Sequence, residues 1–185
     1  MIIYGKQVNI RAIEESDLEI FRKAINSPEL EEKEMKAYFP ISMFEQKKWF
    51  YEQLNNTATD QRYSVDVGSK LVGYTNILNI DYINRSAWFG MKIFEKEMRN
   101  KGLGTDINMS IMRYAFSTLN IQRLETNILI TNKASIHLFT EKCGWTIEGT
   151  RRKASYKNGE YIDVLFLSIL KNEYNTLVTN NHYWG

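Results

Sequence analysis

The stretch "EMRNKGLGTD", residues 97–106, combines two closely spaced glycines with basic and amide side chains. A glycine-rich turn at the start of a helix leaves several backbone N–H groups without intrahelical partners, and the helix dipole adds partial positive charge there. The pattern therefore predicts a loop that holds an anion such as a diphosphate. An ordinary strand-to-helix turn with solvated basic residues explains the same pattern. The residues concerned are Arg99, Asn100, Lys101, Gly102 and Gly104.

Two familiar phosphate-binding motifs do not fit this stretch. It has no Gly-Lys-Ser/Thr at the spacing of a Walker loop. The arrangement Arg99-x-x-Gly102-x-Gly104 also lacks the glycine spacing of the dinucleotide-binding fingerprint. On this stretch alone, an anion loop and a plain turn both remain open.

The residues on either side of the loop predict the two elements that position it. Before the loop, "SAWFGMKIF" (residues 86–94) alternates its side chains and predicts a strand. After the loop, apolar residues that recur every four positions predict a helix with one buried stripe. These residues are Leu103, Ile107, Ile111, Ala115 and Leu119.

Six further segments predict strands. They are "QVNIRAI", "RYSVDV", "KLVGYTNILNI", "RLETNILI", "WTIEGTRRKASY" and "EYIDVLFLSIL". The second and third surround a turn at Gly68-Ser69, and the last two join across Asn158-Gly159, which is a strong hairpin signal.

Capping signals mark three more helices. Ser16 with Glu19, and Ser42 with Glu45, have the spacing of capping boxes. Asn132 is the expected N-cap of a late helix that Gly144 closes in the left-handed conformation. Together these elements predict a mixed α/β domain, a sheet with helices on its faces that is partly antiparallel and ends in a hairpin.

Composition limits the class of protein. A chain of 185 residues with 43% hydrophobic and 25% charged residues suits one domain, expected over residues 1–174, with a polar tail at 175–185 that frays. A net charge of +2 is too small to indicate a nucleic-acid partner. No apolar run suits a membrane span or a signal peptide, and the lone Cys143 fits a reducing, cytoplasmic location. Neither histidine belongs to a ligand cluster, so no metal is expected.

Several segments, in order, resemble the GNAT superfamily of N-acetyltransferases. Arg-x-x-Gly-x-Gly after a strand resembles its acetyl-CoA pyrophosphate loop, and "NKASIHLFTEKCGWTIEGT" resembles its late helix. "NIRAIEESDLEIF", "INRSAWFGMKIF", "YAFSTLNIQRLE" and the final "NGEYIDVLFLSILKNEY" resemble the branch with ribosomal-protein N-terminal acetyltransferases and spermidine acetyltransferases. The resemblance implies a largely antiparallel sheet of about seven strands with helices on both faces. It also implies a bulge in the fourth strand, which splays from the fifth.

The resemblance implies acetyl-CoA as the co-substrate. The pantetheine arm would bond to the backbone from Met91 to Ile93, and an N–H near Ile93 would face the thioester oxygen. The diphosphate would lie on Arg99, Asn100, Lys101, Gly102, Leu103, Gly104 and Thr105. Asn132 would bond the pantetheine and Lys142 would lie near the nucleotide, although a helix cap and a solvated lysine explain these two equally well.

Two departures leave the catalytic residues unassigned. The late-helix tyrosine that protonates the thiolate in many relatives corresponds to Phe139 or, counted from Gly144, to Thr140. The strand glutamate that serves as base corresponds to Trp88. We interpret Phe139 and Trp88 as core or pocket aromatics, with Phe139 facing the cofactor. Thr140 and Glu125 are the remaining candidates for proton transfer, and positioning with oxyanion stabilisation can suffice without them.

The expected reaction transfers acetyl to a primary amine by direct attack in a ternary complex. The amine belongs to a small molecule, an amino sugar or a protein N-terminus. Tyr38, Phe39, Trp49 and Trp88 are the expected acceptor contacts, as an aromatic wall. A homodimer is an expected assembly. The alternative is a non-catalytic acyl-CoA-binding module of the same fold.

Overall fold

The computed structural model describes residues 1–31, 39–53 and 58–185. Eight strands form one sheet in the order β1-β2-β3-β4-β5-β6-β8-β7, antiparallel except for the β5–β6 pair. The strands are β1 (Ile3–Tyr4), β2 (Asn9–Ala12), β3 (Gln61–Val67), β4 (Lys70–Asp81), β5 (Ser86–Ile93), β6 (Arg123–Leu129), β7 (Thr146–Lys157) and β8 (Glu160–Leu170). The predicted mixed, largely antiparallel sheet is confirmed, and its additional strand is the two-residue β1.

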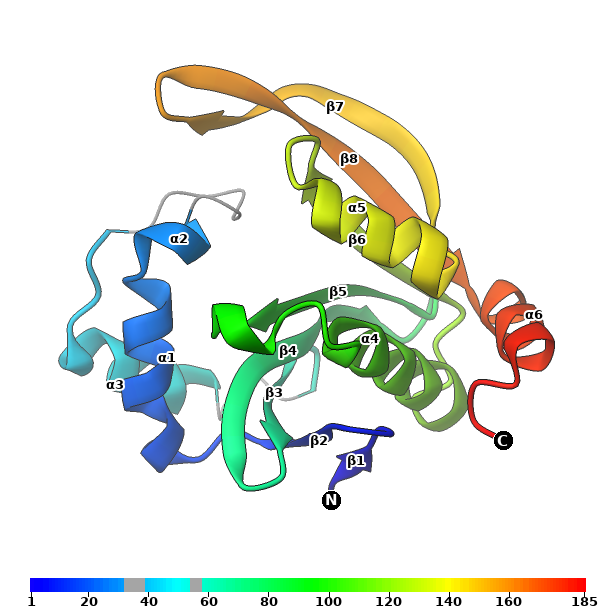
Figure 1. Ribbon diagram of the computed structural model, residues 1–185, viewed down its shortest axis with the longest axis horizontal. Helices are drawn as coiled ribbons and strands as arrows, with labels where there is room; N and C mark the ends of the chain where they lie inside the picture. The colour runs from blue at the N-terminus through cyan, green and yellow to red at the C-terminus, as the bar shows by residue number, and fades with distance from the viewer. Residues whose placement is uncertain (32–38, 54–57) are drawn as a thin grey trace.

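Helices pack on both faces of the sheet, as predicted (Figure 1). They are α1 (Leu18–Ile25), α2 (Pro28–Glu31), α3 (Met43–Gln53), α4 (Leu103–Arg113), α5 (Lys133–His137) and α6 (Lys171–Asn181). Short turns η1 (Glu15–Asp17) and η2 (Lys96–Met98) and π-helical turns η3 (Tyr114–Thr118) and η4 (Leu138–Lys142) adjoin them. Phe21 of α1 contacts Tyr74 of β4 on one face, and Phe139 of η4 contacts Phe89 of β5 on the other.

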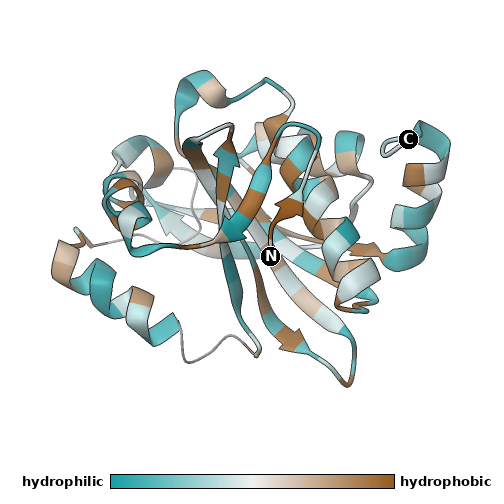
Figure 2. Cartoon of the chain, turned by 90° about the horizontal axis from the view of Figure 1, so that it is seen from below, coloured by the Kyte–Doolittle hydropathy of each residue, from teal (hydrophilic) through white to brown (hydrophobic). Residues whose placement is uncertain are grey.

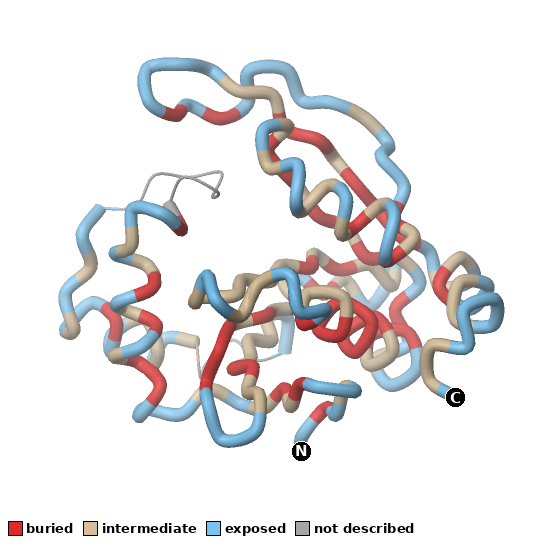
Figure 3. The backbone as a smooth tube through the Cα atoms, in the orientation of Figure 1, coloured by how far each residue is buried: buried red, intermediate tan, exposed pale blue. Residues whose placement is uncertain are grey.

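The core lies between α4 and the central strands, where buried residues concentrate (Figure 3). Of the predicted α4 stripe, Leu103, Ile107, Ile111 and Ala115 are buried and Leu119 packs partly buried against them. Hydrophobic residues likewise alternate with hydrophilic ones along the strands in Figure 2. Among the described residues, no helix is long and apolar enough to cross a membrane.

Both predicted hairpins are present. Gly68 at φ +60° turns β3 into β4, while Asn158 at φ +49° and Gly159 at φ +88° turn β7 into β8. Two successive left-handed residues are what a type I′ turn requires, which explains why Asn-Gly marks this position in the sequence.

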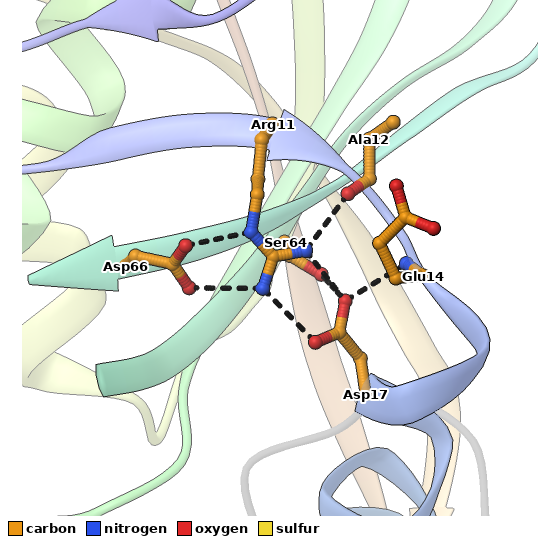
Figure 4. Close-up of polar contacts among 6 residues, drawn as sticks. All are labelled: Arg11, Ala12, Glu14, Asp17, Ser64 and Asp66. Atoms are coloured by element: carbon orange, nitrogen blue, oxygen red, sulfur yellow. Dashed lines mark hydrogen bonds and ion pairs between the residues drawn. The ribbon is translucent and has the colours of Figure 1, made fainter. Parts of the chain in front are cut away.

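The start of α1 differs from the prediction. The capping box joins Glu14 and Asp17, two residues before the expected Ser16 and Glu19. Asp17 is held there because its carboxylate also accepts hydrogen bonds from Ser64 at 2.7 Å and from Arg11 at 2.7 and 2.9 Å (Figure 4). A long-range contact therefore decides the helix start. The other predicted caps, Ser42 with Glu45 and Asn132, are confirmed.

The segment after residue 170 is ordered, so the expectation of a fraying tail is wrong. It forms α6, and Tyr174 is buried against Phe116 with ring centroids 5.3 Å apart. Beyond the helix, the Trp184 indole donates to the Tyr174 hydroxyl at 2.8 Å and stacks against the Arg113 guanidinium. The aromatic residues among the polar ones supply the anchors that composition alone does not reveal.

Candidate functional site

Strands β5 and β6 are parallel neighbours for only three residue pairs. The last pair is Trp88 with Glu125, after which β5 continues to Ile93 and β6 to Leu129, each paired only on its outer edge. The two strands therefore part within the sheet, as the predicted splay requires. We call the opening between residues 89–93 and residues 126–129 the slot.

The backbone of β5 points polar groups into the slot. Phe94 N–H donates to the Val72 carbonyl at 2.9 Å, in register with the β4–β5 ladder. Because successive residues of an antiparallel strand alternate between hydrogen-bonded and non-bonded positions, the N–H groups of Met91 and Ile93 face away from β4. These are the groups that the sequence assigned to pantetheine and the thioester oxygen, and they lie on the slot edge.

The bulge expected in the strand that carries Met91 to Ile93, which is β5 here, lies in the neighbouring strand instead. The β4–β5 register is regular from Gly73 to Leu78 and shifts only between Leu78 and Asp81, so the extra residue belongs to β4. Asn79 there has φ +50°, and its N–H donates to Asp60 at 2.9 Å. The splay is thus made without a bulge in the residues of β5 that line the slot.

The loop at residues 99–102 presents donors at the start of α4. Asn100 at φ +59° and Gly102 at φ +81° are left-handed, and α4 begins at Leu103. The Asp106 N–H is the first to return to the loop, bonding the Gly102 carbonyl at 3.0 Å. The N–H groups of Leu103, Gly104 and Thr105 precede it and have no carbonyl within the helix, so this end of α4 is suited to an anion.

Gly104 lies where three elements meet. A Cβ at this position would lie 2.9 Å from Leu138 Cδ2 of η4 and 3.4 Å from Met91 Cε of β5. The missing side chain therefore lets α4, η4 and β5 approach one another at the slot. The loop, the slot strand and the late helix, which the sequence assigned to one cofactor site, do come together.

Arg99 links the loop to the end of β5. Its guanidinium pairs with Glu29 of α2 and donates to the carbonyls of Phe94 at 3.1 Å and Ile93 at 3.4 Å. The side chain thus fixes the path of the chain from β5 to α4. Its predicted contact with the diphosphate stays a prediction, as do those of exposed Asn100 and Lys101.

Asp106 anchors α4 from behind and was missed by sequence reasoning. Its carboxylate is 1% exposed and accepts the backbone N–H groups of Lys6 at 2.9 Å, Gln7 at 2.6 Å and Val8 at 3.0 Å. The Tyr183 hydroxyl donates to the same carboxylate at 3.1 Å. No sequence pattern joins residues about a hundred positions apart, although a charged residue on the buried side of an amphipathic helix was a signal.

The three residues predicted to contact the cofactor from the late helix lie in different surroundings. Asn132 caps α5 by accepting the Ser135 N–H at 3.2 Å, and Lys142 is exposed. Phe139 is 4% exposed and packs between Phe89 and Trp145 in the core. The interpretation of Phe139 as a core aromatic is confirmed, whereas the cofactor contacts of these three residues stay predictions.

Comparison with known proteins agrees with this geometry. The profile of the acetyltransferase (GNAT) domain matches residues 10–166. The chain belongs to the GNAT acetyltransferase family. It is 28% identical over 173 residues to a spermidine N(1)-acetyltransferase of Vibrio cholerae, covering 92% of this chain and 96% of that protein. A putative ribosomal N-acetyltransferase of Bacillus subtilis is 31% identical over 124 residues, 67% of this chain and 64% of that one.

A solved structure extends the likeness to three dimensions. The crystal structure of spermidine N-acetyltransferase from Vibrio cholerae in complex with CoA and spermine has a TM-score of 0.85 and 26% identity, covering 91% of this chain and 98% of that one. The resemblance inferred from motifs is thereby confirmed. The GNAT chain is an N-acetyltransferase with acetyl-CoA as co-substrate.

At the point where the slot opens, the acetyltransferase holds an ion-paired cluster. Arg123 contacts Glu125 at 2.6 Å and also pairs with Glu148, which accepts the Ser168 hydroxyl at 2.7 Å. The Arg123 and Ser168 hydrogen bonds lower the pKa of Glu148 to about 2. A carboxylate with such a pKa is a poor base near neutral pH, so Glu148 is a structural partner of Arg123.

The remaining proton-transfer candidates are already hydrogen-bonded. The Thr140 hydroxyl donates to the Ile136 carbonyl at 2.9 Å, within the helix. Glu125 is paired with Arg123 beside the Trp88 backbone. Their catalytic roles stay predictions, and neither has the geometry of a dedicated acid or base.

The predicted aromatic wall for the acceptor is only partly described. Tyr38 lies outside the described residues, Phe39 is 90% exposed, and Trp49 is half-buried on α3. Trp88 lies on the β5 face opposite Phe89, with its ring 5.8 Å from Phe166. The wall stays a prediction. Within the described ranges, no group of three His, Cys, Asp or Glu residues is placed to hold a metal ion.

Proposed function

We propose that this acetyltransferase transfers acetyl from acetyl-CoA to a primary amine by direct attack in a ternary complex. The acceptor is a small amine, an amino sugar or a protein N-terminus. The observation that carries the proposal is the slot, where the Met91 and Ile93 N–H groups lie beside the donor-rich start of α4. Family membership supports the acetyl donor, and the relatives named for small amines support the acceptor class.

The chemistry follows from these groups. The neutral amine attacks the thioester carbonyl, and its oxygen becomes an oxyanion that a slot N–H, from Ile93, can stabilise. The intermediate collapses with cleavage of the C–S bond, the amine loses a proton to water, and the thiolate of CoA takes one up. Because the amine attacks the thioester directly, the reaction needs no protein nucleophile.

Two further expectations accompany the proposal. We place the protein in the cytoplasm and expect it to self-associate as a homodimer. Self-association, although not the dimer itself, is supported by a related spermidine N-acetyltransferase of Vibrio cholerae, whose structure is dodecameric. Light scattering of the purified chain tests it directly.

The test is a thiol-release assay with acetyl-CoA over a panel of primary amines, with the acetylated product identified by mass. We expect release that depends on the amine, with intersecting initial-rate patterns that indicate a ternary complex. Parallel patterns with acetylated protein would instead indicate a covalent intermediate. Tight binding of acetyl-CoA without turnover on any amine would favour the non-catalytic module.

A further inference from the structure

Three polar side chains cluster on the face of the sheet that α1 covers in part. They are Arg62 of β3 and Tyr74 and Asn76 of β4, and we call them the Arg62 cluster. Arg62 is the cross-strand partner of Asn76, and side chains of directly opposite residues share a face. Tyr74 lies two residues from Asn76, so it shares that face too, where it contacts Phe21 of α1.

The Arg62 cluster reaches the strand that lines the slot. Asn76 pairs with Gly90 of β5, and a Cβ on Gly90 would lie 3.0 Å from Asn76 Oδ1 and 3.2 Å from Nδ2. The amide therefore occupies the space that any larger residue at position 90 would fill. Gly90 lies two residues past Trp88, where β5 leaves β6. The Arg62 cluster therefore lies beside β5 on this face of the sheet, one strand away from the slot.

The guanidinium of the Arg62 cluster has a donor to spare. Arg62 Nη2 bonds Asp60 at 3.0 Å, and the Arg62 side chain is only 15% exposed. Its Nη1 is buried and has no hydrogen-bond partner in the part of the chain that the structure describes. Since a buried guanidinium nitrogen without a partner is costly, an oxygen supplied by a ligand would stabilise it.

The phenol of the Arg62 cluster is a second donor. The Tyr74 hydroxyl accepts a hydrogen bond from Asn76 Nδ2 at 3.2 Å, and across the described ranges no oxygen accepts the proton of that hydroxyl. Burial raises the pKa of Tyr74, so the phenol keeps its proton at neutral pH. Arg62 and Tyr74 thus offer N–H and O–H groups to an oxygen, beside the amide of Asn76.

We infer that the Arg62 cluster is an acceptor subsite that binds an oxygen on the carbon next to the reacting amine. The class is a carboxylate or an amide carbonyl, as in an α-amino acid or a peptide N-terminus. The ammonium groups of a polyamine offer only donors and cannot accept a hydrogen bond from Arg62 Nη1 or the Tyr74 hydroxyl, so this subsite gives them no advantage. The inference rests on the proposed function, because it assigns the acceptor of that reaction.

The first experiment compares glycine, glycinamide, ethylamine and spermidine as acceptors, with kcat/KM expressed per unit of neutral amine because their pKa values differ. We expect glycine or glycinamide to exceed ethylamine and spermidine by at least about tenfold, since the oxygen gains a charge-assisted hydrogen bond. The order of glycine and glycinamide then separates a carboxylate from a carbonyl. Equal values for glycine, glycinamide and ethylamine, or a preference for spermidine, overturn the inference while turnover itself upholds the function.

Variants locate the effect in the Arg62 cluster. We expect Arg62→Gln and Tyr74→Phe to raise KM for the preferred acceptor about tenfold, leave KM for acetyl-CoA unchanged and abolish the discrimination against ethylamine. Arg22→Gln removes a guanidinium that pairs with Glu19 on α1, outside the cluster, and is the matched control. Tyr74→Phe keeps the ring against Phe21, so it tests the hydroxyl even if Arg62→Gln unfolds the protein.

A binding measurement separates the subsite from turnover. N-acetylglycine, which carries the product's carboxylate, is titrated into the CoA-saturated protein and followed by NMR. We expect Tyr74→Phe to weaken its binding several-fold relative to wild type. If no amine is acetylated, the proposed function fails, and weakened binding in this titration still upholds the subsite. Equal binding by wild type and both variants overturns it.

Discussion

The donor-rich loop before α4 and the Arg62 cluster lie on opposite faces of β5 and are built in opposite ways. The loop uses backbone N–H groups, and its glycines allow the left-handed turn and the close approach of helices. The Arg62 cluster uses three side chains whose meeting depends on the register of β3, β4 and β5. In the proposed function, the loop binds the diphosphate of acetyl-CoA, which is the same for every acceptor. The side chains of the Arg62 cluster would contact the acceptor and can vary with it.

The largest effect is expected at Asp106, whose carboxylate holds the first part of α4 against residues 6–8. Asp106→Ala leaves three backbone N–H groups and the Tyr183 hydroxyl without their acceptor, so the free energy of unfolding should fall by about 4 kcal/mol. Urea unfolding followed by tryptophan fluorescence measures it. Glu160→Ala, exposed at the start of β8, is the control and should change stability by less than about 0.5 kcal/mol. Equal stability of both variants would show that α4 is held by packing alone.

The loop itself is tested by Gly104→Val. A branched side chain would press on Leu138 and Met91 and block close approach of a diphosphate, so acetyl-CoA should bind about a hundredfold more weakly, or about 2.7 kcal/mol. Calorimetry gives the affinity, and circular dichroism checks the fold. Gly149→Val, at a strand position with open space around it, should bind as wild type does. Unchanged affinity in folded Gly104→Val would remove the cofactor from this loop.

The dependence of rate on pH tests whether the acceptor side holds a tuned base. Because Glu148 has a pKa of about 2 and Trp88 stands where the family resemblance places a glutamate, we expect the enzyme to supply no such base. At fixed, subsaturating alkylamine the rate should rise about tenfold per pH unit until the amine titrates near a pKa of about 10.4. Two acceptors of different basicity are compared. A shared plateau at one pH near neutrality would reveal a general base and contradict this interpretation.

The smallest effect is expected at Phe139, which is buried in the core. Phe139→Leu shortens a ring packed on Phe89 and Trp145, so stability should fall by about 1 to 2 kcal/mol while kcat stays within about threefold. Phe139→Tyr should not raise kcat, because a hydroxyl there enters the core. Thr140→Val measures the neighbouring candidate in the same assay. A large fall in kcat for Thr140→Val, without a change in acetyl-CoA affinity, would make Thr140 the acid after all.

The contrast between the two faces also explains what could be read from the sequence. Strand alternation, the α4 stripe and the Asn158-Gly159 turn are local patterns, and each gave the correct element. The order of motifs indicates the family because the glycine loop at residues 99–104 is itself a local pattern. Arg62, Tyr74 and Asn76 carry no such signal, since only strand register joins them.

Errors in the prediction have the same physical origin. The predicted capping box at α1 is two residues too late because Ser64, 47 residues away along the chain, and Arg11 hold Asp17. The C-terminal segment was expected to fray because its polar composition hides three aromatic anchors, Tyr174, Tyr183 and Trp184. Long-range contacts decide these outcomes, and a single sequence does not show them.

The anchoring of α4 has a consequence for synthesis in the cell. During translation, Asp106 is synthesised about a hundred residues after Lys6 to Val8, whose N–H groups it accepts. Tyr183, which donates to Asp106, is synthesised a further 77 residues later. A nascent chain stalled before residue 183 can therefore form most of the sheet while α4 lacks one of the hydrogen bonds to Asp106. If the start of α4 binds acetyl-CoA as proposed, we expect that binding to reach full strength only after Tyr183 has left the ribosome.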